Sequence, residues 1–356
     1  MRHLSCPLVA LLITVLLWPL SSEAYRAQTL QDLTFLAAKR FNRCVEGTPV
    51  PRLSALQVRN LVRGNLAEAD SSWFRNAMRW RFYDRSEQDA RRVLWSIDTR
   101  FHDRFDAVAE RVLADDTPDS DRYGALGVVI HYLQAVTIPA NVVPIFHPRP
   151  WRWPAGDRFS QYPLNVDEFA GELGDLCPEV LSTPGDENFQ TLLDRTAAAT
   201  MAAIRAPIAD MDATWQTFYR EGEPGQFGSY GAAGNSFGRA ARFPCGDDEC
   251  LLLDDDPIYR EFARIQHRLA LIGSMRSMLV LQRRLALLGP APGPLIGPSP
   301  ADVRRPDAPE VIEQDPGQDP GIDLELDLEL DLERGEDERV DDGAEQAIDR
   351  YGDQGR

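Results

Sequence analysis

Lysine and histidine are scarce in this chain, and its cationic side chains are almost all arginines. Lys39 is the only lysine among 38 basic residues, and the 356 residues include five histidines. The net charge is −18, and residues 301–356 alone carry 20 acidic against 6 basic side chains. Residues 1–300 are therefore nearly balanced, and they have no basic stripe of the kind that phosphate backbones select.

Long uninterrupted apolar runs are also absent after the first two dozen residues. Residues 1–24 carry Arg2 and His3 near their start, continue through LVALLITVLLWPL and end in SSEA. This pattern predicts a secretory signal peptide cleaved after Ala24. A membrane anchor is the weaker alternative, because the run is shorter than the roughly 20 residues that a span needs. Arg276, Arg283 and Arg284 interrupt the apolar pattern at 257–288. We therefore predict an exported protein, periplasmic or extracellular, with no transmembrane segment in the mature chain.

Cysteine occurs five times, and four cysteines follow the predicted signal peptide. Cys245 and Cys250 bracket the polar turn GDDE, so we expect them to form a local disulfide. Cys44 and Cys177 then pair by elimination. A zinc site made of four cysteines is the weaker alternative, because only one short pair exists and export favours oxidation.

Apolar periodicity predicts helices throughout the body of the chain, and no convincing strand pattern occurs. Spacings of three and four predict helices at 29–43, 54–70, 86–114, 122–136, 165–176, 186–205, 208–220 and 257–288. Ser54 and Gln57 form a capping box at the start of the second of these. We predict an all-α fold with a single large helical bundle domain at 25–289.

Two segments have compositions unlike the rest. Residues 222–238, GEPGQFGSYGAAGNSFG, lack the Gly-Lys-Ser or Gly-Lys-Thr ending of a phosphate cradle, so we expect a flexible surface loop, with a ligand lid as the alternative. Residues 290–356 begin as a proline-rich linker and become acidic, which predicts a disordered tail. DLELDLELDLE (323–333) alternates carboxylate and leucine, so calcium binding or docking of a protein partner is the alternative there.

Four short segments carry the functional signal. In chain order they are AEADSSW (67–73), RFYD (81–84), GVVIHYLQAVTIPANVVPI (127–145) and DRFSQYPLNVDEF (157–169). Their order and helical setting resemble the core motifs of the zinc-dependent phospholipase C superfamily, which contains the single-strand-specific nucleases. The resemblance covers roughly residues 25–170. It implies the helical fold of that family and hydrolysis of phosphoesters by water activated on three zinc ions.

Few of the zinc ligands that the resemblance implies are present. Asp70 matches a carboxylate ligand, and His131 matches the histidine on the central helix. The seven other ligand positions carry residues of another type: Tyr25, Thr34, Arg81, Ala135, Asn141, Phe159 and Pro163. The family pattern uses five histidines, whereas the mature chain has His102, His131, His147 and His267. We expect His102 and His267 at the surface, because charged residues flank both.

Two hypotheses follow for the site. In the first, Asp70 is a buried carboxylate whose charge Arg81 neutralises in place of the metal, and His131 is a hydrogen-bonded core residue. An exposed Arg81 in an ordinary surface contact is the alternative. In the second, one residual zinc ion is held by Asp70, His131 and His147, with Asp70 as the catalytic candidate.

The first hypothesis predicts a pseudoenzyme, that is, a phospholipase C/nuclease-like protein that has lost its three zinc ions and acts as a noncatalytic binding or scaffold protein. Arg81, Asn141 and Tyr83 are then candidate binding residues for a phosphate-containing ligand or a lipid headgroup, and the acidic tail is a candidate site for a protein partner. The second hypothesis predicts a metal-dependent phosphoester hydrolase with a reduced metal site.

Overall fold

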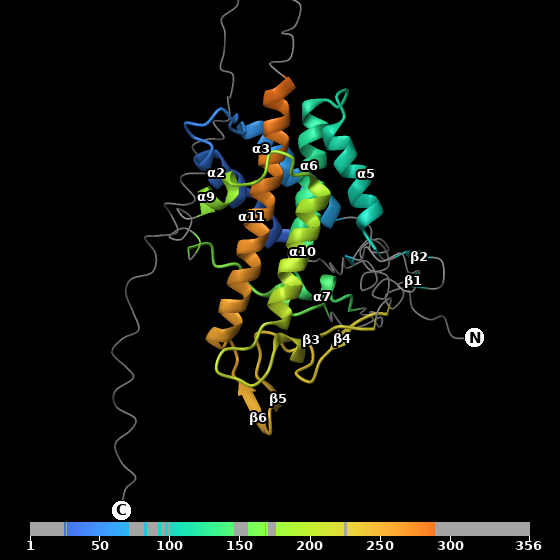
Figure 1. The fold of residues 1–356 in the computed structure, drawn as a ribbon, viewed down its shortest axis with the longest axis vertical. Helices are drawn as coiled ribbons and strands as arrows, with labels where there is room; N and C mark the ends of the chain where they lie inside the picture. Colours follow the sequence, from blue (N-terminus) through green and yellow to red (C-terminus); the bar gives the residue numbers. More distant parts are fainter. Residues whose placement is uncertain are drawn as a thin grey trace, which may run out of the picture. The chain divides into compact units, whose positions relative to one another are not determined.

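The computed structural model describes residues 25, 27–70, 82–83, 92–93, 97–98, 100–145, 156–167, 169, 176–223 and 226–288. All of them belong to one compact unit that ends at Pro292. The predicted signal peptide (1–24) and the predicted tail (290–356) lie outside the described residues and stay predictions. The described chain is mostly helical, as Figure 1 shows, which agrees with the predicted all-α class.

Six long helices form the bundle. They are α2 (Ala27–Cys44), α3 (Ala55–Ala69), α5 (His102–Leu113), α6 (Asp119–Ala135), α10 (Phe189–Arg205) and α11 (Pro257–Leu288). The capping box at the start of α3 is confirmed, because Gln57 N donates to Ser54 Oγ and Ser54 N donates to Gln57 Oε1. None of the helices in the described ranges is long and apolar enough to cross a membrane.

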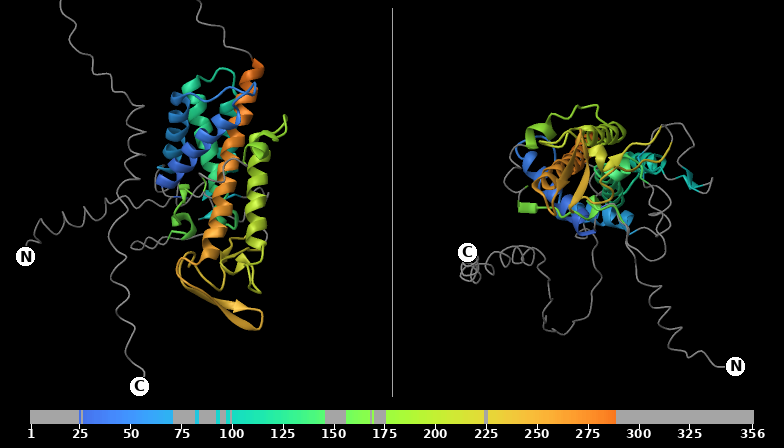
Figure 2. Two further views of the ribbon diagram at one scale, coloured as in Figure 1. Left: turned by 90° about the vertical axis from the view of Figure 1, so that its left-hand side faces the viewer. Right: turned by 90° about the horizontal axis from the view of Figure 1, so that it is seen from below.

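Helix α6 is buried on nearly all sides, and it contacts α3, α5, α10 and α11. Its crossing with α3 is close because glycines lie at the contact. A methyl group added to Gly127 would lie 2.2 Å from the carbonyl oxygen of Leu61. Helix α11 lies between α2 and α10, as the two views in Figure 2 show. These contacts place the residues of α6 in the centre of the bundle.

The predicted helix at 86–114 is wrong at the described residues 92–93 and 97–98 of its first half. Strand β1 (Arg92–Val93) pairs antiparallel with β2 (Ile97–Asp98), and α5 begins only at His102. Val93 and Ile97 are four residues apart, a spacing that fits a helical stripe. They also face each other in the register of this pair, where β-branched side chains are favoured.

The predicted helix at 208–220 is also wrong. The segment holds a 3-10 turn (η3, Trp215–Thr217) and strand β3 (Tyr219–Arg220), which pairs with β4 (Ser229–Tyr230) inside the glycine-rich segment. Asp210 has a left-handed φ of 60°, which an α-helix does not admit. The glycine-rich segment is therefore anchored to the body by β4 at its middle.

The remaining elements are short. They are α7 (Pro139–Val142), the 3-10 turn η2 (Phe159–Gln161), α9 (Leu176–Leu181), and the hairpin of β5 (Ala241–Cys245) and β6 (Asp248–Leu252). The expectation that the body has no strands is wrong for this hairpin, whose five-residue strands are too short to give a clear alternating pattern. Most of the predicted helix at 165–176 lies outside the described residues.

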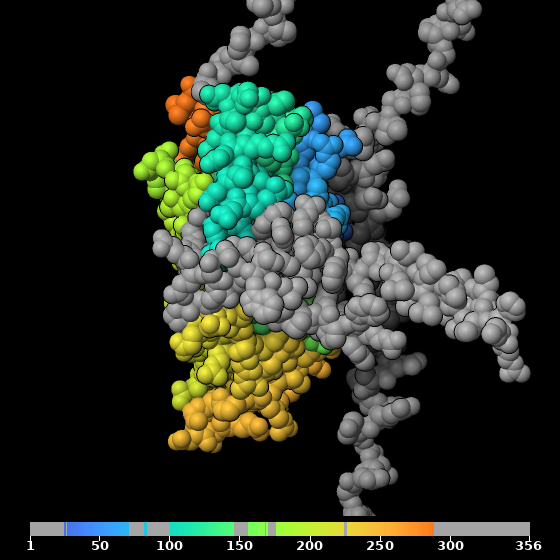
Figure 3. All heavy atoms as spheres, turned by 90° about the vertical axis from the view of Figure 1, so that its right-hand side faces the viewer, coloured from blue at the N-terminus to red at the C-terminus, as the bar shows by residue number. Residues whose placement is uncertain are grey.

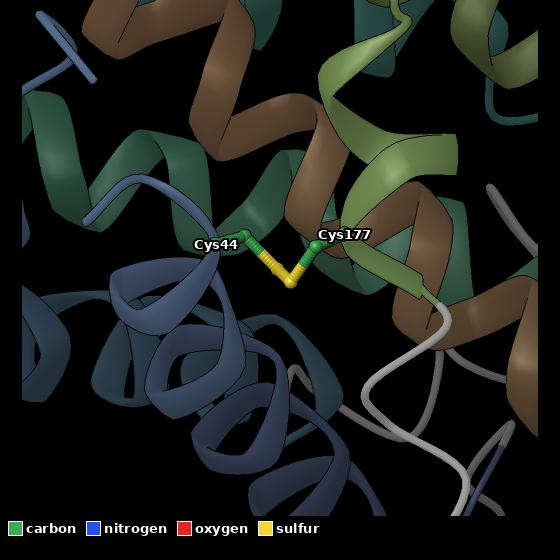
Figure 4. The surroundings of a disulfide bond; sticks show 2 residues. All are labelled: Cys44 and Cys177. Atoms are coloured by element: carbon green, nitrogen blue, oxygen red, sulfur yellow. A yellow bond between two sulfur atoms is a disulfide. The ribbon is translucent and has the colours of Figure 1, made fainter. Parts of the chain in front are cut away.

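Both predicted disulfides are present. Cys44, at the end of α2, is bonded to Cys177 on α9, as Figure 4 shows. Cys245 and Cys250 join β5 to β6. The first bond links segments that are 133 residues apart in sequence.

Candidate functional site

His131 lies inside the bundle, on the side of α6 that faces α3. It is 8% exposed, and its Nδ1 lies 3.2 Å from Oδ1 of Asn65. Because an amide oxygen only accepts hydrogen bonds, this contact assigns a proton to Nδ1. Burial lowers the pKa of His131 from 6.5 to about 4, so the imidazole is neutral at pH 7.

Asn65 connects His131 to side chains from three helices. Its Nδ2 donates to Thr34 Oγ1 on α2 at 2.7 Å and to Gln134 Oε1 on α6 at 2.9 Å. Nε2 of Gln134 in turn donates to Thr34 Oγ1 at 3.1 Å and to Ser274 Oγ on α11 at 3.3 Å. His131 therefore belongs to a buried network whose members hydrogen-bond one another, as the core alternative predicts.

Glu68 is the buried carboxylate of this region. It accepts a hydrogen bond of 2.6 Å from the Tyr132 hydroxyl and one of 3.0 Å from Arg104 on α5. Burial alone would raise the pKa of Glu68, but the hydrogen bonds from Arg104 and Tyr132 outweigh it and lower the pKa below its usual value. The carboxylate is therefore ionised and paired at neutral pH.

Asp70, by contrast, is exposed at the C-terminal end of α3. The assumption that Asp70 is buried is therefore wrong. Asn65 and Glu68 face α6, whereas residue 70 lies about 200° further around the helix than residue 68. Arg81 and His147 lie outside the described residues, so the Arg81 pair and the third ligand of a residual zinc site stay predictions.

Asn141 and Ala135, two positions where the resemblance expects metal ligands, contact each other at the C-terminal end of α6. Nδ2 of Asn141 donates a hydrogen bond of 2.9 Å to the carbonyl oxygen of Ala135. The carbonyl oxygen of Asn141 accepts from the backbone of Tyr83, whose hydroxyl donates to Asp194. The structure thus brings the candidate binding residues Asn141 and Tyr83 together, with the Asn141 side chain buried and Tyr83 only partly buried.

Tyr25 and Phe159, two further expected ligand positions, also contact each other. Their ring centroids are 6.1 Å apart. The Tyr25 hydroxyl lies 3.1 Å from Thr137 Oγ1, just beyond the end of α6. Burial raises the pKa of Tyr25 well above its usual value, so the phenol is protonated at neutral pH.

His267 completes this aromatic group, and its expected surface position is wrong. Its ring lies 5.5 Å from that of Tyr25 and 6.1 Å from that of Phe159, and the residue is 2% exposed. Its Nε2 has no hydrogen-bond partner among the described residues. Burial lowers the pKa of His267 to about 4. The adjacent Arg268 is no guide to the position of His267, because successive residues of a helix point about 100° apart.

His102 is the other histidine expected at the surface. Its side chain is partly buried, and its Nε2 lies 3.3 Å from Asp103 Oδ1.

In the described ranges, no three or more His, Cys, Asp or Glu side chains are grouped so that they could hold a metal ion.

Sequence reasoning missed the roles of Glu68, Arg104 and Asn65. The sequence indicates two of them by their spacing. Asn65 and Glu68 are three residues apart in a predicted helix, so their side chains share one face of it. Glu68 also lies within the acidic segment at 67–73, but the resemblance was aligned on Asp70. No comparable signal marks Arg104, because its pairing with Glu68 depends on how α5 packs against the bundle.

Comparisons of the chain with protein-family models, with curated proteins and with solved structures gave no match.

Proposed function

We propose that this protein has a helical fold of the phospholipase C/nuclease type, that packed side chains have replaced its metal site, and that it acts by binding rather than by catalysis. The proposal combines the sequence resemblance with the contacts at the C-terminal end of α6. Both disulfides are compatible with export to an oxidising compartment.

The observation that carries the proposal is how the matched positions are grouped. Ligands of one metal cluster must lie close together, so positions that match such ligands should meet even where the residues have changed. Tyr25 contacts Phe159, and Asn141 contacts Ala135. The Tyr25 hydroxyl, bonded to Thr137, links the first pair to the end of α6. This grouping of four matched positions supports the resemblance, whereas Asp70, the matched carboxylate, is exposed at the end of α3.

The chemistry of these side chains does not suit zinc. Phenyl and methyl groups at Phe159 and Ala135 offer no electron pair. The Asn141 amide nitrogen is a donor that is already bonded. Zinc in proteins is held by thiolates, imidazoles and carboxylates. The described residues at these positions therefore do not fit a trinuclear zinc site.

The charge of the buried Glu68 is also balanced without a cation from solution. Glu68 is held by Arg104 and Tyr132, and His131 is neutral and bonded to Asn65. Removing a metal from a carboxylate site leaves a buried negative charge, which is costly unless a cation replaces the metal. Arg104 supplies such a cation for Glu68.

The proposal includes two binding activities. A phosphate-containing ligand or a lipid headgroup binds near Tyr83 and Arg81, and a protein partner binds through the acidic tail. Asn141 is the weakest of the three candidate binding residues, because its side chain is buried and its amide donates to Ala135.

Metal analysis tests the proposal. The full chain should be purified with zinc present, freed of loosely bound metal and analysed for zinc by mass spectrometry, alongside hydrolysis of bis(4-nitrophenyl) phosphate. We expect neither stoichiometric zinc nor hydrolysis. Three zinc ions per chain together with hydrolysis would overturn the proposal.

The residual-metal alternative has its own signature. One zinc ion per chain that is lost in His131→Ala but kept in His267→Phe would favour a hydrolase with a single metal. His267→Phe is the matched control, because His267 is also buried but lies outside the predicted ligand set.

A further inference from the structure

The hairpin of β5 and β6 has a two-residue turn, and this fixes which backbone groups face outward. Cys245 pairs with Asp248 across the turn, and Gly246 has a left-handed φ of 58°. A two-residue hairpin closes on a hydrogen-bonded pair, and such pairs alternate along an antiparallel ladder. The pairs Pro244–Glu249 and Arg242–Leu251 are therefore the non-hydrogen-bonded ones.

Strand β6 consequently has an open edge. The amide and carbonyl groups of Glu249 and Leu251 point away from β5, and no backbone group in the described ranges bonds to them. The outer edge of β5 offers fewer hydrogen-bond donors to an added strand, because Pro244 has no N–H. Unpaired strand edges are ready templates for another strand.

The side chains along this edge combine apolar surface with negative charge. Leu251 is 47% exposed and Leu253 is 61% exposed. Asp247, Asp248 and Glu249 are exposed beside them, and Figure 3 shows the hairpin segment in gold at the surface. Glu249 lies 3.6 Å from Arg242, but both side chains are mostly exposed, so this ion pair is weak and exchangeable.

The hairpin is held in shape before any partner arrives. The Cys245–Cys250 disulfide joins its strands. Its inner face packs on the body, where Phe243 contacts Phe218 with ring centroids 5.8 Å apart and Leu252 is fully buried. An edge ordered in advance costs less entropy when it binds.

We propose that β6 is a docking edge that accepts an extended segment of a partner protein as a third, antiparallel strand. Glu249 and Leu251 lie on the same outward face, so the residues next to them on the partner are also two apart. Glu249 favours a cation and Leu251 an apolar side chain. The partner segment therefore reads apolar, any residue, then lysine or arginine. Main-chain hydrogen bonds to Glu249 and Leu251 supply the docking itself.

A second copy of this chain fits the edge less well. In an antiparallel pair of two β6 strands, Glu249 would face a leucine or the other Glu249, because β6 holds no cation. The turn also lies beside Asp212, because a methyl group added to Gly246 would lie 2.6 Å from Asp212 Oδ2. The charge of this end therefore selects a basic partner. The inference holds whether or not the bundle binds zinc, so it goes beyond the proposed function.

A fluorescent peptide in which valine and arginine stand two residues apart, as in Thr-Val-Thr-Arg-Thr, is the probe, and its binding to the full chain is measured by fluorescence anisotropy. Leu251→Pro removes the outward N–H without breaking a ladder bond, whereas Leu251→Thr keeps it. We expect binding to weaken at least about tenfold in Leu251→Pro and less than about threefold in Leu251→Thr. Methylating the peptide's backbone nitrogens should abolish binding to the unmodified protein, which tests the edge even if Leu251→Pro fails to fold.

Several outcomes would overturn the proposal. They are no binding of the peptide to the unmodified protein, equal binding of the methylated peptide, or equal binding of a peptide in which glutamate replaces arginine. Dimerisation of the chain that disappears in Leu251→Pro, measured by analytical ultracentrifugation, would identify the occupant as a second copy and would also overturn it.

Discussion

Arg104 on α5 donates a hydrogen bond of 3.0 Å to Glu68 on α3, so a guanidinium holds a buried carboxylate between two helices. The side chain of Glu68 is 9% exposed and that of Arg104 is 34% exposed. The pair has the chemistry that the sequence had suggested for Asp70 and Arg81, with different residues.

The first prediction concerns this pair. Arg104→Met leaves Glu68 with only the Tyr132 hydroxyl, and we expect it to lower the free energy of unfolding by about 1 to 3 kcal/mol, less than for a fully buried pair because water reaches Arg104. Urea unfolding at pH 7 measures the loss. Adding Glu68→Gln should recover part of it, since no buried charge then remains. A double variant no more stable than Arg104→Met would contradict this account.

The second prediction concerns acid. The pKa of His131 and that of His267 are lowered from 6.5 to about 4 in the folded protein, so the unfolded chain takes up protons first as the pH falls. Their contribution to stability is complete above pH 6.5 and is lost between about pH 6.5 and 4, by up to about 3 kcal/mol for each histidine.

Urea unfolding at pH 7, 6, 5 and 4 measures this loss. His267→Phe should reduce the pH dependence by about half. It should not weaken the fold at pH 7, because the Nε2 that it removes has no partner in the described structure. An unchanged pH profile in His267→Phe would count against burial as its cause.

The third prediction concerns the crossing of α3 and α6. An alanine at Gly127 would bring its Cβ to 2.2 Å from the Leu61 carbonyl oxygen, whereas an alanine at Gly124 on the same helix would meet nothing within 4 Å. We expect Gly127→Ala to cost at least about 2 kcal/mol and Gly124→Ala to stay within about 1 kcal/mol of the unmodified protein. Thermal unfolding compares the two, and equal losses would mean that the helices can separate at little cost.

The fourth prediction compares the disulfides. Cys44 and Cys177 are 133 residues apart, and Cys245 and Cys250 are 5 apart. Loop-closure entropy gives about 5 kcal/mol for the first bond and about 2 kcal/mol for the second. Paired alanine substitutions, followed by urea unfolding, should reproduce this order. The reverse order would show that contacts near the hairpin, and not chain entropy, decide the effect.

The helices were predictable where local signals agreed. Ser54 and Gln57 marked the start of α3, and Pro257 opened a long periodic stretch that became α11. The predictions were wrong where one pattern fits two structures, as with Val93 and Ile97, or where a turn depends on one backbone angle, as at Asp210. Periodicity describes one segment at a time, whereas strand pairing also depends on a second.

The candidate site was predictable in part. The sequence correctly placed His131 on a central helix, and the alternative that it is a hydrogen-bonded core residue agrees with its contact to Asn65. It gave the buried carboxylate to Asp70, because a motif letter does not show which way a residue faces at the end of a helix. The partners of Glu68 come from α5 and α6, and no local pattern links those segments.

The network of Thr34, Asn65, Gln134 and Ser274 has a consequence for how uniquely the chain folds. Apolar contacts are not directional, so four helices packed only by apolar side chains could shift along their axes relative to one another with little change in energy. Moving any of these four helices by one turn, about 5.4 Å, would strand amide or hydroxyl groups in a dry interior. The network thus fixes the heights of α2, α3, α6 and α11 relative to one another.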